Sequence, residues 1–178
     1  MIITTLLRKN RIYRTFLLPI LTCMLSVAIS SCDKTDDERI PVTNEHLSIS
    51  QAAWIRYGIH GAFEHVYFIK HRGIPTGYPY VAFDDTGYAG ILLVTGGGGE
   101  SDLKAYSPAC PVERDPNVLI EITTDVDNHP IGSCPKCGST FDVFNFGTPL
   151  TGEAAQRKFS LSPYSIHSES GYPVIVTP

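Results

Sequence analysis

From Leu47 onward, the chain is a series of short apolar runs separated by turn-forming residues. The runs are rich in β-branched and aromatic residues, and none has the 3.6-residue period of a long amphipathic helix. Turn formers such as Gly73-Ile74-Pro75, Asp84-Asp85-Thr86-Gly87 and Gly96 to Gly99 end them. Strands this short bury apolar surface only by joining sheets, so the pattern predicts an all-β fold of antiparallel sheets or a small barrel.

The apolar runs define the expected strands. A short helical piece is conceivable only around residues 59–64, where Gly58 and Gly61 weaken the pattern. The expected strands are Leu47–Ile49, Ala53–Tyr57, Val66–Ile69, Tyr80–Phe83, Gly90–Thr95, Leu103–Tyr106, Val118–Thr123, Thr140–Val143, Phe159–Leu161, Tyr164–His167 and Val174–Val176.

The N-terminal region has the layout of a signal peptide. Residues 1–14 carry four basic side chains and no acidic one, and residues 15–29 form an apolar run. A membrane span needs about 20 apolar residues, and this run is shorter and contains Pro19. We therefore expect the segment to be removed rather than to span a membrane.

The segment Ile29-Ser30-Ser31-Cys32 resembles the lipobox of bacterial lipoproteins. The resemblance implies a lipoprotein signal peptide over residues 1–31, membrane lipid attached to Cys32 and an acidic tether over residues 32–44. The expected location is the cell envelope, with the chain anchored to the outer membrane on its periplasmic face or at the cell surface. A plain secreted protein cleaved near Ser31 is the alternative.

The chain has five cysteines, an odd number that cannot pair completely within one molecule. Cys23 leaves with the expected signal peptide and Cys32 is consumed by lipid. Three thiols then remain in the domain, on Cys110, Cys134 and Cys137. Three is still odd, which fits a metal site with one outside ligand better than a closed disulfide framework.

The segment Cys134-Pro135-Lys136-Cys137-Gly138 has the pattern of a metal-binding turn. Proline restricts the backbone, glycine permits a positive φ, and sulfurs three residues apart converge. Two sulfurs do not complete a tetrahedral site. Cys110 and Glu113 have the same three-residue spacing, so the predicted ligands are Cys110, Glu113, Cys134 and Cys137.

The region around these cysteines resembles Rieske iron–sulfur domains. Residues 134–142 and the downstream run 159–166 are similar to the second cluster-binding loop and the tail of that family, and residues 105–112 are similar to the first loop. The resemblance implies a Rieske-like domain over residues 45–178, with a metal-site subdomain at about 105–150. It also implies an iron–sulfur cofactor, electron transfer and a redox protein as partner.

The residues depart from the Rieske pattern at the ligand positions. A Rieske centre uses two cysteines and two histidines. Cys137 and Val112 stand where the family has histidines. An alternative alignment matches Cys110 to an extra disulfide cysteine of some family members and leaves Ala105 and Ser107 at the ligand positions. An ordinary two-histidine cluster cannot form in either alignment.

Three interpretations follow from these departures. The first is a centre on Cys110, Cys134 and Cys137 that holds zinc, a single iron or an altered [2Fe–2S] cluster. The second is a disulfide from Cys110 to Cys134 or Cys137, which stabilises the fold by about 3 kcal/mol and leaves one thiol free. The third is a non-redox envelope protein that uses an empty Rieske-like scaffold for binding or structure.

Composition and motifs exclude several other functions. The formal net charge is −4 and no basic stripe is visible, so nucleic acid is not an expected partner. The sequence shows no hydrolytic triad or nucleotide fingerprint, and the glycines at 96–99 lack the Lys-Ser/Thr pair of a phosphate loop. We expect no enzyme activity from the chain by itself, and at most an electron-transfer role within an oxidoreductase system.

Overall fold

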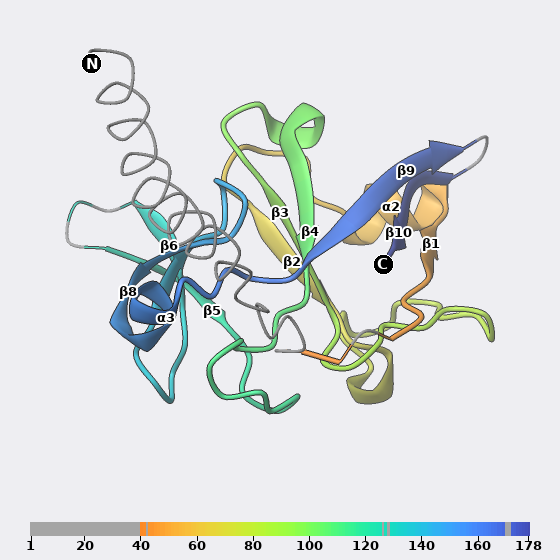
Figure 1. The fold of residues 1–178 in the computed structure, drawn as a ribbon. Helices are drawn as coiled ribbons and strands as arrows, with labels where there is room; N and C mark the ends of the chain where they lie inside the picture. Colours follow the sequence, from red (N-terminus) through yellow and green to blue (C-terminus); the bar gives the residue numbers. More distant parts are fainter. Residues whose placement is uncertain (1–39, 42, 126, 128, 170–171) are drawn as a thin grey trace, which may run out of the picture. The chain divides into compact units, whose positions relative to one another are not determined.

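The computed structural model describes residues 40–178 except 42, 126, 128 and 170–171 (Figure 1). The expected signal peptide, Cys32 and most of the expected acidic tether lie outside the described residues. Within the described part of the chain, no helix has both the length and the apolar character needed to cross a membrane.

Two antiparallel sheets form the fold, which confirms the predicted all-β class (Figure 1). The six-stranded sheet has the order β1-β10-β9-β4-β3-β2, and the four-stranded sheet has the order β5-β6-β7-β8. The strands are β1 (Leu47–Ile49), β2 (His65–Phe68), β3 (Ile91–Thr95), β4 (Leu103–Tyr106), β5 (Glu121–Thr124), β6 (Pro130–Ser133), β7 (Thr140–Asp142), β8 (Thr148–Thr151), β9 (Pro163–Glu169) and β10 (Tyr172–Thr177).

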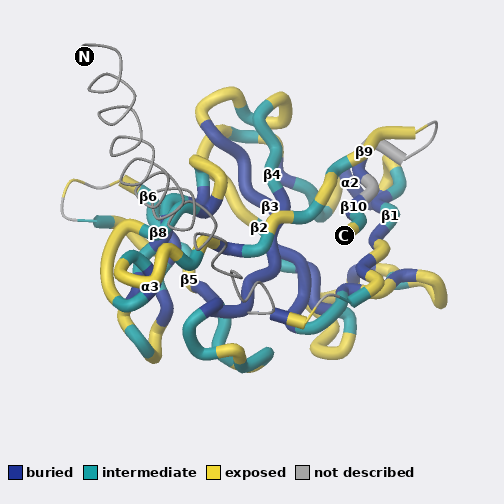
Figure 2. The backbone as a smooth tube through the Cα atoms, viewed as in Figure 1, coloured by how far each residue is buried: buried dark blue, intermediate teal, exposed yellow. Residues whose placement is uncertain are grey.

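Strand β3 is buried along its whole length and packs into two hydrophobic cores (Figure 2). Successive side chains of a strand point to opposite faces. Ile91 and Leu93 accordingly join the first core, while Leu92 and Val94 join the second. The second core also contains residues of the four-stranded sheet, among them Phe141 of β7. Packing on the two faces of β3 therefore connects both sheets.

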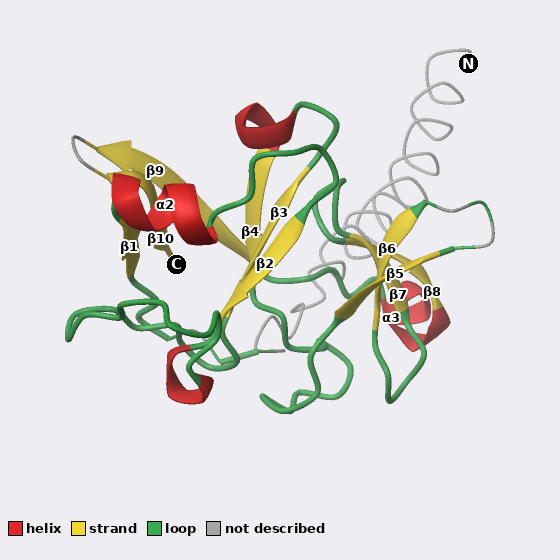
Figure 3. Cartoon of the chain, turned by 180° about the vertical axis from the view of Figure 1, so that it is seen from behind, coloured by secondary structure: helices red, strands yellow, loops and turns green. Residues whose placement is uncertain are grey.

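Helix α2 (Gln51–Tyr57) occupies the segment for which the sequence predicts a strand at Ala53–Tyr57, and that prediction is wrong. The Ser50 side chain accepts a hydrogen bond from the Ala53 N–H and so caps the helix N-terminus. Ala53 and Trp54 are buried in the first core. Seen from behind, α2 lies beside β1 and β10 (Figure 3). Capping and packing thus favour the helix over the apolar run's strand propensity.

Other segments also differ from the prediction. Residues 80–83 form a turn, because the Asp84 carboxylate and the Lys70 ammonium take up backbone groups that a strand would pair with a neighbour. Residues 159–161 form no strand, and residues 59–64 form no helix. The sequence analysis missed the strands β6 and β8, the helix α3 (Gly152–Arg157), and two short 3-10 helices, η1 (Lys70–Arg72) and η2 (Gly99–Asp102). Strands β6 and β8 have no apolar run of their own and are held by pairing with the neighbouring strands β5 and β7.

Gly147 and Gly73 offer a matched pair for testing this packing. Both have a φ of 64°. A Cβ on Gly147 would lie 2.8 Å from Leu161 Cβ, whereas a Cβ on Gly73 would meet nothing within 4 Å. We expect Gly73→Ala to lower the free energy of unfolding by about 1 kcal/mol through backbone strain alone. Gly147→Ala should lower it by about 2–4 kcal/mol, because overpacking adds to the same strain.

Urea denaturation of the two variants measures this difference. Equal destabilisation by the two substitutions would contradict the close packing of Gly147 against the second core.

Candidate metal centre

Three cysteine side chains from two separate loops meet in the second core. Cys110 lies between β4 and β5, and Cys134 and Cys137 lie in the turn between β6 and β7. Their sulfurs all lie within 4.8 Å of one another. Cys110 and Cys134 are buried and Cys137 is partly exposed. The three residues are free thiols, and the Cys110 and Cys137 sulfurs are 3.6 Å apart, well beyond the S–S bond length of about 2.05 Å.

The turn at Cys134 to Gly138 has the backbone that its sequence pattern predicts. The Gly138 N–H donates to the Cys134 carbonyl at 3.0 Å, and the Cys134 N–H donates to the Ser139 carbonyl at 2.9 Å. Gly138 has a φ of 69°, which glycine adopts without steric cost. This tight turn brings Cys134 and Cys137 together.

The loop that carries Cys110 turns in a similar way. The Arg114 N–H donates to the Cys110 carbonyl at 3.0 Å. The backbone N–H groups of Val112 and Glu113 also form hydrogen bonds to Cys110 that favour its thiolate. The Cys110 N–H donates to the Val118 carbonyl at 3.2 Å, which fixes the two sides of the loop to each other. Cys110 thus sits in a turn whose N–H groups stabilise negative charge on sulfur.

Ser139 supports Cys137, and the sequence analysis did not assign it to the site. Its side chain is fully buried, lies 3.3 Å from the Cys137 sulfur and accepts the Ala154 N–H at 3.1 Å. Ala154 belongs to α3, so this hydroxyl connects the cysteine turn to that helix. The sequence could have identified Ser139 as a site residue, because it directly follows the Cys-Pro-x-Cys-Gly segment.

The thiols differ in acidity because their surroundings differ. Burial raises the pKa of the Cys110 thiol to about 12. The backbone hydrogen bonds from Glu113 and Val112 lower this pKa, but their effect is smaller than that of burial. Burial also opposes ionisation of the Cys137 thiol. Hydrogen bonds with the Ser139 hydroxyl and backbone and with the thiols of Cys134 and Cys110 together outweigh this effect of burial. The pKa of Cys137 is therefore below its ordinary value. A metal ion must displace the proton of Cys110, so its binding depends on pH.

Glu113, the fourth ligand that the sequence predicts, does not belong to the group formed by the three sulfurs. The Glu113 carboxylate forms an ion pair with the Lys136 ammonium at 2.5 Å. Hydrogen bonding to Glu113 raises the pKa of Lys136, which keeps the ammonium charged. Lys136 stands between the two cysteines of the second loop, so this ion pair connects that loop to the first one.

A two-histidine Rieske cluster does not fit this donor set. Among the described residues, no histidine belongs to the group formed by the three sulfurs. Val112 packs against the second core instead of supplying a ligand. A separate cluster in the β5–β6 connection contains Asp125, Asp127 and His129, and the two backbone N–H groups that bind the Asp125 carboxylate explain its geometry.

Comparison with known proteins yields one structural similarity. No protein-family model matches the chain, and no curated protein matches its sequence. A chain of a solved structure described as a complex of reduced oxygenase and oxidized ferredoxin in carbazole 1,9a-dioxygenase is 17% identical and has a TM-score of 0.40. The match covers 76% of this chain and 94% of that chain. A match at this level assigns the chain to no family.

Differences in exposure predict an order of thiol modification. In reduced, metal-free protein at neutral pH, we expect iodoacetamide to modify Cys137 at least about tenfold faster than Cys110 or Cys134, because thiolate character and access govern reactivity. Peptide mass spectrometry over a time course measures the three rates. In urea the three rates should converge, and modification of Cys110 first in the folded protein would contradict the geometry.

Removal of the Ser139 hydroxyl provides a second test. Ser139→Ala should raise the pKa of Cys137 and shift the pH profile of its alkylation upward, because the hydroxyl that accepts from the Cys137 thiol also hydrogen-bonds to the ionised sulfur and favours it. It should also lower the free energy of unfolding by about 1–3 kcal/mol, since the Ala154 N–H loses its buried acceptor. Ser160→Ala, at an exposed serine, is the control. If the pH profile of Cys137 alkylation is unchanged in Ser139→Ala, Ser139 is not part of the site.

Proposed function

We propose that this chain is a metal–thiolate protein that holds one metal ion on Cys110, Cys134 and Cys137. The mutual approach of the three sulfurs carries the proposal. With metal–sulfur bonds of about 2.3 Å, sulfurs around a tetrahedral ion are about 3.8 Å apart. The 3.6 Å between the Cys110 and Cys137 sulfurs matches that spacing, and thiolates select soft or borderline ions such as zinc or iron.

The same spacing favours a single ion over a two-iron cluster. A [2Fe–2S] cluster distributes four protein ligands over two irons. Here three sulfurs surround one point, and no described histidine joins them. The two-loop layout supports a Rieske-like scaffold, since one cysteine loop follows β4 and the other joins β6 to β7. We infer that the scaffold is Rieske-like and that its centre is mononuclear.

A small outside ligand completes the proposed coordination. The sequence-based role of Glu113 as fourth ligand requires its carboxylate, which pairs with Lys136 through Oε2, to move into the group of sulfurs that does not now include it. Water or a low-molecular-weight thiol needs no such change, and the partly exposed Cys137 lies on the accessible side of the group. In this proposal Glu113 and Lys136 hold the two loops together instead of binding the metal.

The proposed role is electron transfer to or from a redox protein, with iron as the ion. Thiolate ligands support iron redox chemistry, whereas zinc at the same ligands has only a structural role. The proximity of Cys110 and Cys137 favours one alternative, a disulfide in an oxidising compartment that leaves Cys134 as a free thiol. In that case the chain is a non-redox envelope protein with a structural crosslink.

We also propose that the protein is anchored in the cell envelope through lipid on Cys32. The support is the Ile29-Ser30-Ser31-Cys32 segment after a basic and then apolar N-terminal region. Acyl chains contribute about 0.8 kcal/mol of membrane binding for each buried methylene group.

Metal analysis of protein purified without oxygen tests the centre. We expect one iron for each chain, no acid-labile sulfide and a visible absorption band from thiolate-to-iron charge transfer. Serine substitution of Cys110, Cys134 or Cys137 should weaken metal binding by more than the ~10–100-fold effect of losing a supporting hydrogen bond. If the purified protein contains zinc and is colourless, the site is structural. If it contains no metal and has a single free thiol, the disulfide alternative is correct.

Glu113→Gln separates the two roles of that carboxylate. Metal affinity should stay within about threefold of the unmodified protein while stability falls by up to about 1 kcal/mol, the range of a partly exposed ion pair. Competition with a chromophoric chelator measures the affinity. A loss of tenfold or more would restore Glu113 as the fourth ligand.

Cys32→Ala and Cys23→Ala form a matched pair for the lipid anchor. Cys32→Ala should abolish incorporation of labelled fatty acid and release the protein from the membrane fraction. Cys23→Ala should leave both unchanged, because that residue lies inside the expected signal peptide. Membrane association of the Cys32→Ala protein at the unmodified level would refute the anchor.

A further inference from the structure

The three sulfurs of the proposed centre differ in their access to small solutes. Cys110 and Cys134 are 0% and 1% exposed, whereas Cys137 is partly exposed. An oxidant in solution therefore contacts Cys137 before the other two residues. A sulfur that binds a metal ion has also lost its proton, and the thiolate is the form that reacts with oxidants.

A second sulfur is placed to react with an oxidised Cys137. The Cys110 sulfur lies 3.6 Å from the Cys137 sulfur. An S–S bond is about 2.05 Å long, so the two atoms need to approach by about 1.5 Å to form it. Because Cys110 is buried, its thiol is available to Cys137 and is shielded from the oxidant itself. Cys137 and Cys110 thus have the arrangement of a reactive thiol and its resolving thiol.

The ion pair between Lys136 and Glu113 keeps the loops of these two sulfurs together. Lys136 directly precedes Cys137, and Glu113 lies three residues after Cys110. The turn that contains Glu113 is closed by the hydrogen bond from the Arg114 N–H to the Cys110 carbonyl. The two loops are therefore in contact before any bond forms between their sulfurs.

We propose that Cys137 is a site of oxidation by hydroperoxides and that Cys110 resolves the oxidised sulfur to a disulfide. In the first step the Cys137 sulfur attacks the peroxide. An S–O bond forms, the O–O bond breaks, and the leaving oxygen takes up a proton and departs as an alcohol, or as water from hydrogen peroxide. In the second step the Cys110 sulfur attacks the sulfenic sulfur, the S–O bond breaks and a second water leaves. Two thiols lose two electrons in total, and one peroxide gains them.

The disulfide regulates the centre because it removes two of its three thiolates. This consequence rests on the proposed metal–thiolate function. Cys134 remains as a single buried sulfur, and one protein ligand does not retain an ion that needs four. A dithiol reductant reverses the change by thiol–disulfide exchange. Peroxide thus empties the centre, and reduction restores it.

Treatment of reduced, zinc-loaded protein with hydrogen peroxide tests the proposal. Zinc is the probe because it has no redox chemistry of its own. We expect peptide mass spectrometry to find a Cys110–Cys137 disulfide and a free Cys134 thiol, and a chromophoric chelator to detect zinc release in parallel. Dithiothreitol should restore zinc binding. A Cys134–Cys137 disulfide, a sulfinic acid on Cys137 in place of the disulfide, or zinc retained after crosslinking would overturn the proposal.

Chelator-treated protein separates this proposal from the metal proposal. The same disulfide should form without zinc, because the fold brings the two sulfurs together. Protein that binds no zinc but forms the disulfide would contradict the metal centre and support the oxidation site. Protein that binds zinc but forms no disulfide would contradict the oxidation site alone.

Serine substitutions assign the role of each sulfur. Cys137→Ser should slow the oxidation of the remaining thiols by peroxide at least about tenfold, because the accessible sulfur is lost. Cys110→Ser should leave a sulfenic acid on Cys137 that dimedone traps. Cys134→Ser is the matched control and should form the Cys110–Cys137 disulfide at nearly the unmodified rate. A dimedone adduct on Cys134 in the Cys110→Ser protein would contradict the assignment.

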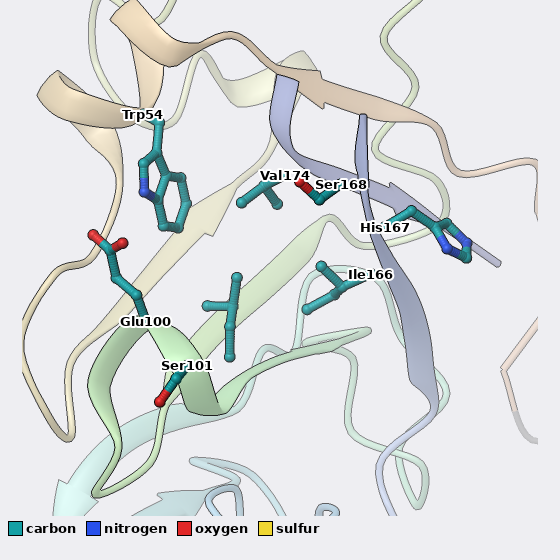
Figure 4. A pocket seen from close by; sticks show the side chains of 8 residues that line it. Trp54, Glu100, Ser101, Ile166, His167, Ser168 and Val174 are labelled. Carbon is teal, nitrogen blue, oxygen red and sulfur yellow. The ribbon is translucent and has the colours of Figure 1, made fainter. Parts of the chain in front are cut away.

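Trp54, the single tryptophan of the chain, reports whether the oxidised protein and the variants stay folded. It lies in the first core, beside a hollow that Glu100 and Val174 also line (Figure 4), whereas the cysteines lie in the second core. Its fluorescence should therefore stay unchanged on oxidation and in each serine variant. If a variant loses this signal, the disulfide found in the unmodified protein decides between Cys110 and Cys134 as the resolving residue.

Discussion

The burial of β3 on both faces is the constraint on which the rest of the structure depends. Its five residues are all buried, and alternate side chains enter two different cores. One core holds α2 and the strands that pair with β10, and the other holds the four-stranded sheet and the cysteine loops. A change that disturbs β3 therefore affects both the general fold and the position of the thiols.

The second core explains why three thiols far apart in sequence meet. Cys110 and Cys134 are packed among Ile120, Phe141 and other apolar residues, so water is excluded from two of the three sulfurs. Apolar burial disfavours a thiolate unless a metal ion or hydrogen bonds compensate. Backbone N–H groups around Cys110 and the Ser139 hydroxyl beside Cys137 supply part of that compensation. A bound cation would supply the remainder, which is the physical basis of the proposed metal centre.

A centre of three thiolates differs in its chemistry from one that includes histidine ligands. Two neutral imidazoles raise the potential of a Rieske cluster, whereas thiolates increase the negative charge around a metal. In this chain Val112 packs against the second core, and Cys137 brings a third sulfur to the group formed with Cys110 and Cys134.

The sequence by itself determined the local features: the all-β class, strands such as Leu47–Ile49 and Leu103–Tyr106, and the turn at Cys134 to Gly138. These depend on alternation, proline and glycine over a few residues, which act without distant partners. Tertiary structure decided that Ala53–Tyr57 is helical, because burial of Ala53 and Trp54 in the first core outweighs strand propensity, and the local cap from Ser50 only adds to it. It also decided that the Cys110 loop reaches the Cys134 turn and that the Glu113 carboxylate pairs with Lys136. Contacts between residues distant in sequence depend on how strands pair and cores pack, and no local pattern encodes them.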